Sequence, residues 1–290
     1  MNLNIDDIIH PTDNFARKKL EAIPGFSIVI KKFLQLGYEK MIQGENLANK
    51  IKLSPTQLPE IYNILPPICE KLSIQIPEFY LEMNPTPNAY TYGDTTTSIT
   101  VTSSLVEYLN GDELKAVIAH ECGHILCRHV LYNTMAQCLQ MGLSFSTITN
   151  SLILPVQLAL LYWSRRAEFS ADRVSALICE SSTPIVNTMI RLAGGSKTIT
   201  KNVNVDEYAS QASSYDLFLE SKWNKVLLFQ NRAFTDHPFN SVRVREILSW
   251  VKSDTFINII NESQKPTECP NCHTKIESNW KFCRHCGIKL

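Results

Sequence analysis

One helical stretch most constrains what this chain can fold into. Residues 116–130 read AVIAHECGHILCRHV, and they place His120, Glu121 and His124 close together in an otherwise apolar segment. Its apolar residues recur around a helix, and the preceding NGDELK offers Asp112 as an N-cap. Histidines four residues apart lie on one face of a helix, so both imidazoles can reach the same ion. The segment therefore predicts a metal-binding helix.

This pattern is typical of zinc-dependent hydrolysis. That chemistry needs two neutral nitrogen ligands, a third protein ligand, an open position for water and a carboxylate that accepts the water's proton. Glu121 lies one step round the helix, where it can reach the water rather than the ion. The alternative is a chance match, in which the histidines are hydrogen-bonded to backbone in a core.

A second segment favours the metal site. AEFSADR places Glu168 and Asp172 four residues apart on a predicted helix that is otherwise largely apolar. Two carboxylates on a half-buried helix face need a cation or hydrogen-bond donors. Glu168 as third zinc ligand, with Asp172 bonded to the outer nitrogen of a zinc-binding histidine, meets that need. Pairing with Arg165 or Arg173 is the alternative.

Composition limits the class of protein. A chain of 290 residues with 44% hydrophobic residues can hold one large domain, or one domain and a small module. A net charge of zero disfavours a polyanionic partner, and the amino terminus lacks the basic start and apolar core of a secretory signal. Five cysteines are scattered without paired spacing, as is typical of reduced thiols in a cytoplasmic protein: Cys69, Cys122, Cys127, Cys138 and Cys179. We expect Cys122 to pack in the core rather than to bind metal.

The remaining patterns divide the chain into elements. Apolar spacing and turn residues predict helices over 11–44 with a break at 23–26, near 58–72, and over 216–231 and 240–251. They also predict strands over 78–82 and 98–102 joined by a loop over 84–96, and a polar loop over 197–214. Residues 131–164 contain no charged residue or histidine. Polar residues and Pro155 interrupt them, so we expect two buried or membrane-touching helices rather than a membrane span.

The carboxy terminus carries a second metal pattern. CPNCHTKIESNWKFCRHC holds two CxxC pairs, and four thiolates at such spacing form a closed structural zinc site, which stabilises a small zinc ribbon. The expected ligands are Cys269, Cys272, Cys283 and Cys286, with His273 and His285 as alternatives that are not needed. Acidic neighbours and the thiolate centre offset the basic residues, so we expect contact with a protein rather than with nucleic acid.

Several motifs occur in the order of a known family. HECGH after DELKAVIA, then RRAEFSADR and DHPFNSVRVREI, resemble the zinc endopeptidases that include HtpX and the CAAX prenyl protease, over roughly residues 8–253. The resemblance implies His120, His124 and Glu168 as ligands and Glu121 as general base. It also implies His237 and Arg243 as groups that stabilise the oxyanion; without it, DHP is equally well a turn before a helix.

The resemblance extends to substrate binding. NAYTYG, with Asn88, Ala89 and Tyr90, is similar to the family stretch before the active-site edge strand. Peptides can add to an open strand edge through main-chain hydrogen bonds. We therefore expect the substrate to dock along residues 98–102, including Ser98, Ile99 and Thr100.

These observations lead to one expected organisation. Residues 1–260 form an α+β, mainly α, zincin-like (gluzincin) metallopeptidase domain, residues 261–268 a linker and residues 269–290 the zinc ribbon. The expected function is zinc-dependent endopeptidase cleavage of polypeptides, as in protein quality control, with one catalytic and one structural zinc. The protein is expected in the cytoplasm, with peripheral membrane contact through residues 131–164 left open. A chaperone-like binding protein of the same fold and a nucleic-acid-binding ribbon protein are the rival hypotheses.

Overall fold

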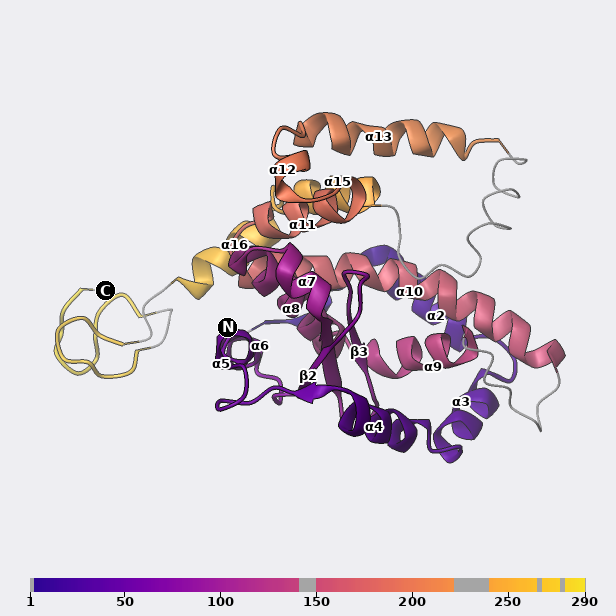
Figure 1. Ribbon diagram of the computed structural model, residues 1–290. Helices are drawn as coiled ribbons and strands as arrows, with labels where there is room; N and C mark the ends of the chain where they lie inside the picture. Colours follow the sequence, from indigo (N-terminus) through magenta and orange to yellow (C-terminus); the bar gives the residue numbers. More distant parts are fainter. Residues whose placement is uncertain (1–2, 141–149, 222–239, 265–267, 277–279, 290) are drawn as a thin grey trace.

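The structure, a computed structural model, describes residues 3–140, 150–221, 240–264, 268–276 and 280–289 (Figure 1). These residues are mainly helical with one small sheet, which confirms the fold class expected from the sequence. The helices are α1 (Ile5–Ile8), α2 (Pro11–Glu21), α3 (Phe26–Gln35), α4 (Tyr38–Asn49), α5 (Pro59–Tyr62), α6 (Leu65–Leu72), α7 (Ser103–Tyr108), α8 (Gly111–Leu126), α9 (Val130–Gln140), α10 (Asn150–Ile178), α11 (Thr183–Gly194), α12 (Lys197–Thr200), α13 (Val205–Phe218), α15 (Asn240–Trp250) and α16 (Asp254–Ser263). The strands are β1 (Ile51–Lys52), β2 (Glu78–Glu82), β3 (Ala89–Tyr92) and β4 (Ser98–Thr102).

The sheet has the strand order β1-β2-β4-β3, so β3 lies at an edge and β4 lies inside. Strand β4 pairs in parallel with β2 and antiparallel with β3, where Tyr90 lies opposite Thr100. All five residues of β4 are buried. The expectation that residues 98–102 offer an open edge to substrate is therefore wrong. Residues 84–96, expected to be a loop, contain β3, and β3 covers that edge.

Helix α8 begins with reciprocal hydrogen bonds between a cap and the first turn. The Glu113 N–H donates to Asn110 Oδ1 at 2.9 Å, and the Asn110 N–H donates to Glu113 Oε2 at 3.0 Å. The N-cap is therefore Asn110, and the expected Asp112 lies in the first turn, where its charge suits the helix dipole. From Ala116 to His124 every residue is buried, so α8 runs through the interior.

Helices α8 and α10 cross at close range, and this crossing requires Gly123. A Cβ atom at Gly123 would lie 2.9 Å from Ala171 Cα and 3.0 Å from Val174 Cβ. Two helix backbones come this near only where no side chain separates them. The crossing brings the α10 segment that carries Glu168 and Asp172 against the histidines of α8.

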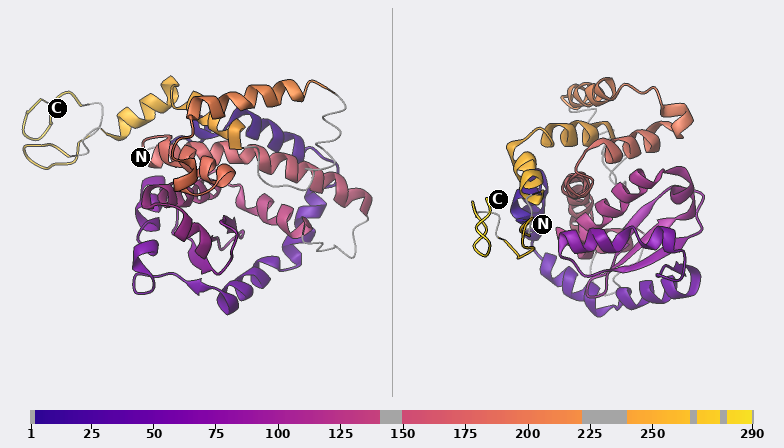
Figure 2. Two further views of the ribbon diagram at one scale, coloured as in Figure 1. Left: turned by 45° about the horizontal axis from the view of Figure 1, so that its top comes forward. Right: turned by 90° about the vertical axis from the view of Figure 1, so that its left-hand side faces the viewer.

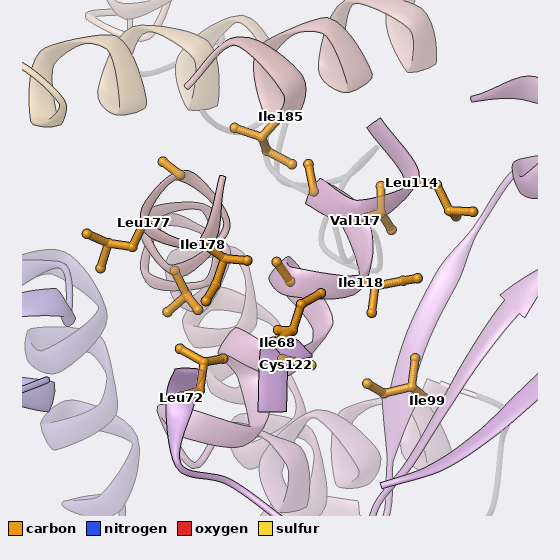
Figure 3. Close-up of a cluster of buried hydrophobic side chains, with 14 of the residues drawn as sticks. Ile68, Leu72, Ile99, Leu114, Val117, Ile118, Cys122, Leu177, Ile178 and Ile185 are labelled. Atoms are coloured by element: carbon orange, nitrogen blue, oxygen red, sulfur yellow. The ribbon is translucent and has the colours of Figure 1, made fainter. Parts of the chain in front are cut away.

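The main core surrounds α8. Figure 3 shows Ile118 and Cys122 of α8 near Ile68 of α6 and Ile99 of β4, with Ile178 of α10 on the side that faces them. This placement confirms the expectation that Cys122 is core. In Figures 1 and 2, α10 lies between the C-terminal helices α11, α13 and α15 on one side and the sheet with α9 and α4 on the other. A second apolar cluster joins α2, α3, α9 and α10.

Some expectations for the C-terminal half are wrong. Residues 197–214, expected to be a polar loop, form α12 and most of α13, because Asn204 Oδ1 accepts hydrogen bonds from the first N–H groups of α13. The helix expected over 216–231 begins within α13, and its part beyond residue 221 lies outside the described residues. The expected linker begins inside α16, which ends at Ser263.

The uncharged residues 131–164 belong to α9 and the first half of α10, apart from 141–149, which lie outside the described residues. Their buried members include Met135 and Trp163 in the second apolar cluster. Among the residues described, no helix has both the length and the apolar character that a membrane crossing requires.

Candidate active site

The α8 histidines and Glu168 of α10 bring three donor groups together. His120 Nε2 lies 3.2 Å from His124 Nε2 and 3.4 Å from Glu168 Oε2, and His124 Nε2 lies 3.3 Å from Glu168 Oε1. All three residues are buried. Ligands of a tetrahedral zinc ion with bonds of about 2.0–2.1 Å stand about 3.3 Å apart. The three groups therefore fit one zinc ion and leave one tetrahedral position for water.

The outer nitrogen of His120 faces an acid that is itself held by an arginine. His120 Nδ1 lies 2.9 Å from Asp172 Oδ1. Arg243 of α15 donates from Nε to Asp172 Oδ2 at 2.8 Å and from Nη2 to Asp172 Oδ1 at 2.6 Å, and its Nη1 lies 3.2 Å from Glu168 Oε2. Arg173, a partner considered from the sequence, instead donates to backbone carbonyls at the end of α1. One arginine thus orients both acids.

These contacts set the charges of the cluster. Burial by itself lowers the pKa of His120, but Glu168 and Asp172 outweigh it and raise that pKa to about 10. Burial raises the pKa of both acids, whereas Arg243 and His120 lower it further, so both pKa values lie below the usual range. Without metal, a protonated His120 lies beside two carboxylates. A divalent cation that replaces this proton is stabilised by the negative charges of the same two carboxylates.

Glu121 lies beside the histidines and contacts the edge strand. Donor atoms of His120, Glu121 and His124 all lie within 4.8 Å of one another. Thr91 of β3 donates from Oγ1 to Glu121 Oε2 at 2.6 Å, and both residues are buried. Sequence reasoning missed Thr91, because its strand was expected to be loop. Only the pairing of β3 with β4 brings Thr91 to the carboxylate.

Two cavities flank the donor group. The larger, about 290 Å³, is lined by His120, Glu121 and Glu168 and by the apolar residues Leu105, Val117, Ile185 and Met189. The smaller, about 50 Å³, lies on the α9 side of the same residues. Of the six expected substrate residues, Asn88 and Ala89 line the larger cavity and Tyr90 lines the smaller one. The other three, in β4, line neither cavity, because that strand is interior.

A third histidine lies behind His124. His124 Nδ1 is 3.1 Å from His129 Nδ1, and His129 Nε2 is 3.0 Å from Asp13 Oδ2. Burial lowers the pKa of His129, despite the opposing effect of Asp13. Sequence reasoning missed both residues. The short spacing between His124 and His129 was a visible signal, whereas nothing in the α2 sequence marks Asp13.

His237, the expected partner of Arg243 at the oxyanion, lies outside the described residues.

The carboxy-terminal cysteines form a second donor group. The Sγ atoms of Cys269, Cys272, Cys283 and Cys286 all lie within 4.8 Å of one another. Two pairs are 3.5 and 3.6 Å apart, close to the spacing of about 3.8 Å between thiolates on tetrahedral zinc. Hydrogen bonding with the Thr274 side chain lowers the pKa of Cys272 to about 5, which favours the thiolate. His273 and His285 are exposed, so four sulfur atoms complete the site without them.

Comparisons with known proteins match the two parts of the chain that carry these donor groups. The family model of peptidase family M48 matches residues 59–251, and a zinc-ribbon domain model matches residues 269–290. The plastoglobule-localized metallopeptidase 48 of Arabidopsis thaliana is 32% identical over 267 residues, which cover 91% of this chain and 78% of that protein. A protease HtpX homolog from Pelotomaculum thermopropionicum is 27% identical over 228 residues, covering 67% of this chain and 77% of the homolog.

Among solved structures, S. mikatae Ste24p aligns with a TM-score of 0.45 and 16% identity, over 81% of this chain and 61% of that one. The match of one family model to most of the chain, together with the identity to the plant metallopeptidase, shows the family. The chain belongs to peptidase family M48 and is a zinc metalloprotease with a carboxy-terminal zinc-ribbon domain.

Proposed function

We propose that this protein cleaves peptide bonds at a zinc ion held by His120, His124 and Glu168. The observation that carries the proposal is that the two imidazole nitrogens lie 3.2 Å apart and that each has one Glu168 carboxylate oxygen at 3.3 or 3.4 Å, which is the spacing of ligands on one tetrahedral zinc ion. A zinc ion bound there supplies a Lewis acid that polarises the scissile carbonyl and acidifies the attacking water. Polypeptides are the substrates of this family of enzymes.

The residues around the donor group take separate roles. Glu121 accepts a proton from the attacking water and then returns it to the leaving amine nitrogen. The hydrogen bond from Thr91 holds the Glu121 carboxylate toward the cavity side of α8. Arg243 has three nitrogen atoms engaged with Asp172 and Glu168, so we now assign it to positioning those acids rather than to the oxyanion. His237 stays the predicted oxyanion donor.

The substrate is best accommodated along β3. This strand has β4 on one side only, so its other edge can pair with an extended peptide. Its residues Ala89, Tyr90 and Thr91 line the two cavities that flank the site. The larger cavity, with its apolar lining, suits an aliphatic or aromatic side chain next to the scissile bond.

The two metals would differ in character. The histidine and glutamate group supplies three protein ligands and leaves a position for water, which is typical of a catalytic zinc. The four cysteines supply a closed site, typical of a structural zinc that stabilises a module with little core of its own. We infer one zinc ion of each kind in a chain.

Peripheral contact of residues 131–164 with a membrane is a separate prediction. Leu154 and Tyr162 of α10 are large, about half exposed, and belong to this uncharged stretch. Fractionation of cells tests it: a peripheral protein is released by carbonate, whereas retention that only detergent reverses contradicts the prediction.

The hydrolysis proposal is tested with Glu121→Gln and Glu168→Ala in the full chain. Zinc content is measured together with cleavage of a peptide mixture analysed by mass spectrometry. Glu121→Gln should abolish cleavage and keep both zinc ions, because this carboxylate acts on water. Glu168→Ala should lose one zinc ion together with activity. Glu107→Gln, an exposed change on α7, is the matched control. Full activity of Glu121→Gln would refute the assignment of this residue as the base, whereas no cleavage by the zinc-loaded parent protein would favour a binding protein of the same fold.

A further inference from the structure

A buried polar group lies behind the zinc ligand His124 and takes no part in the chemistry described above. Asp13 and His129 are each only 1% exposed. A carboxylate and an imidazole in an apolar interior destabilise a fold unless their hydrogen-bonding groups are satisfied. Here they are satisfied, and the hydrogen bonds lead to the metal site.

A turn at the end of α8 places His129. Arg128 adopts a left-handed conformation with φ +58°, the Arg128 N–H donates to the Ile125 carbonyl at 3.1 Å, and the His129 N–H donates to the His124 carbonyl at 2.9 Å. This is a Schellman ending with a residue other than glycine in its left-handed position, which is unfavourable for an L-residue by about 1 kcal/mol. The turn brings the His129 ring against His124.

The hydrogen-bond pattern assigns the tautomers of both rings. His124 Nε2 faces Glu168 Oε1 and His120 Nε2, so it is the metal-binding nitrogen and carries no proton when metal is bound. The proton of His124 is then on Nδ1, which donates to His129 Nδ1. The proton of His129 is consequently on Nε2, which donates to Asp13 Oδ2. Each nitrogen finds a partner in this one arrangement.

Asp13 is anchored from two other directions. Trp163 Nε1 donates to Asp13 Oδ1 at 2.9 Å, and Ser170 Oγ donates to Asp13 Oδ2 at 2.6 Å. The Ser170 hydroxyl in turn accepts from the His10 N–H at 2.9 Å, just before α2. The carboxylate is thus a fixed acceptor at the far end of the two imidazoles.

We propose that Asp13 and His129 are positioning residues that orient the zinc ligand His124 and hold its Nε2 free for the metal. They would do for His124 what Asp172 does directly for His120. Asp13 precedes residues 59–251, the part matched by the family model, so a segment outside that part completes the site. The inference rests on the zinc site proposed above.

The competing explanation is a purely structural one, in which Asp13 only attaches α2 to α10, through Trp163 and Ser170, and to the turn between α8 and α9, through His129. Ser170→Ala is the matched control for it, because it removes one hydrogen bond between α2 and α10 at the same carboxylate oxygen, while Asp13 keeps both the Trp163 hydrogen bond that anchors it and the His129 contact. A purely structural role predicts that Asp13→Asn, His129→Phe and Ser170→Ala lower stability and zinc affinity in parallel.

The experiment measures zinc affinity by competition with a chelator and thermal unfolding of the metal-free protein. It uses the full chain carrying Cys272→Ser and Cys286→Ser, so that only the histidine site is titrated. Asp13→Asn and His129→Phe should weaken zinc binding by about 10- to 100-fold. Ser170→Ala should lower the unfolding temperature of the metal-free protein yet change zinc affinity less than about 3-fold, within the scatter expected of an indirect contact.

Two outcomes overturn the inference. In the first, Asp13→Asn and His129→Phe keep the parent's zinc affinity. In the second, Ser170→Ala weakens zinc binding as much as they do. His120→Ala separates this failure from failure of the zinc site itself: if His120→Ala also leaves zinc binding unchanged, the proposed site is wrong, whereas if it abolishes binding, only the positioning role is wrong.

Discussion

Replacing Gly123 with alanine tests whether the α8–α10 crossing builds the metal site. The added Cβ would lie 2.9 Å from Ala171 Cα, a backbone atom that cannot rotate away, and ordinary contact begins near 3.4 Å. The helices must therefore separate locally by about half an ångström. Overpacking of this kind lowers the free energy of unfolding by about 1–3 kcal/mol, whereas the change from glycine to alanine in a helix interior by itself raises it by about 0.5–1 kcal/mol. We expect a net loss of about 1–2 kcal/mol in the free energy of unfolding.

The same shift should reach the zinc site, because Glu168 moves with α10. Metal–ligand distances tolerate only about 0.2 Å, so half an ångström should weaken zinc binding by about 10-fold or more, or about 1.4 kcal/mol. The assays are denaturant unfolding of the metal-free protein and chelator competition for zinc.

Gly44→Ala is the matched control for this prediction. Gly44 lies in the interior of α4, and a Cβ added there meets nothing within 4 Å. It should stabilise the protein by about 0.5–1 kcal/mol and leave zinc affinity unchanged. If Gly123→Ala stabilises the protein as Gly44→Ala does and keeps zinc affinity, the close crossing does not position the ligands and the reasoning is refuted.

Three further predictions concern the charges and hydrogen bonds of the site and the ribbon. The raised pKa of His120, about 10 against about 6.5 when unfolded, contributes stability that is complete below pH 6.5 and is lost as the pH rises through 10. Unfolding temperatures of metal-free protein should therefore fall over this range, whereas those of zinc-loaded protein should not; parallel curves contradict the assignment. Thr91→Val should lower kcat by about 10-fold with zinc retained, since a hydrogen bond to a charged group is worth about 1.5–3 kcal/mol. Thr91→Ser keeps the hydroxyl and should keep the parent's kcat. Equal kcat values for the two variants would argue against a role for this hydrogen bond. Cys272→Ser should reduce the zinc content measured by elemental analysis by one equivalent, and the double variant Cys272→Ser/His120→Ala should contain no zinc. If the double variant loses only one equivalent relative to the parent protein, the two-site assignment is wrong.

Much of the fold and the donor types could be predicted from local patterns. Helical periodicity and the four-residue spacing place His120 and His124 on one face whatever surrounds them, because helix geometry is local. The CxxC pairs indicate a ribbon for the same reason. Strands β2 and β4 were predicted with their observed bounds, since alternation and turn residues act over a few positions. The N-cap of α8 and the helical structure of residues 197–214 were not predicted, because several neighbouring polar residues could cap a helix or form a loop and a local pattern does not distinguish between them.

Only the tertiary structure decided which residues complete the site. Strand β3 is the edge strand because it pairs with β4 and with no other strand of the sheet, a pairing that the periodicity of its own residues does not reveal. Arg243, rather than an arginine on α10 itself, pairs with Glu168 and Asp172 because α15 packs across that helix. Asp13, which is 116 residues before His129 in the sequence, reaches that histidine because α2 packs against α10. Donor chemistry is a property of residue type and spacing, which a sequence contains, whereas its orientation depends on contacts between distant segments, which form only when the chain is folded.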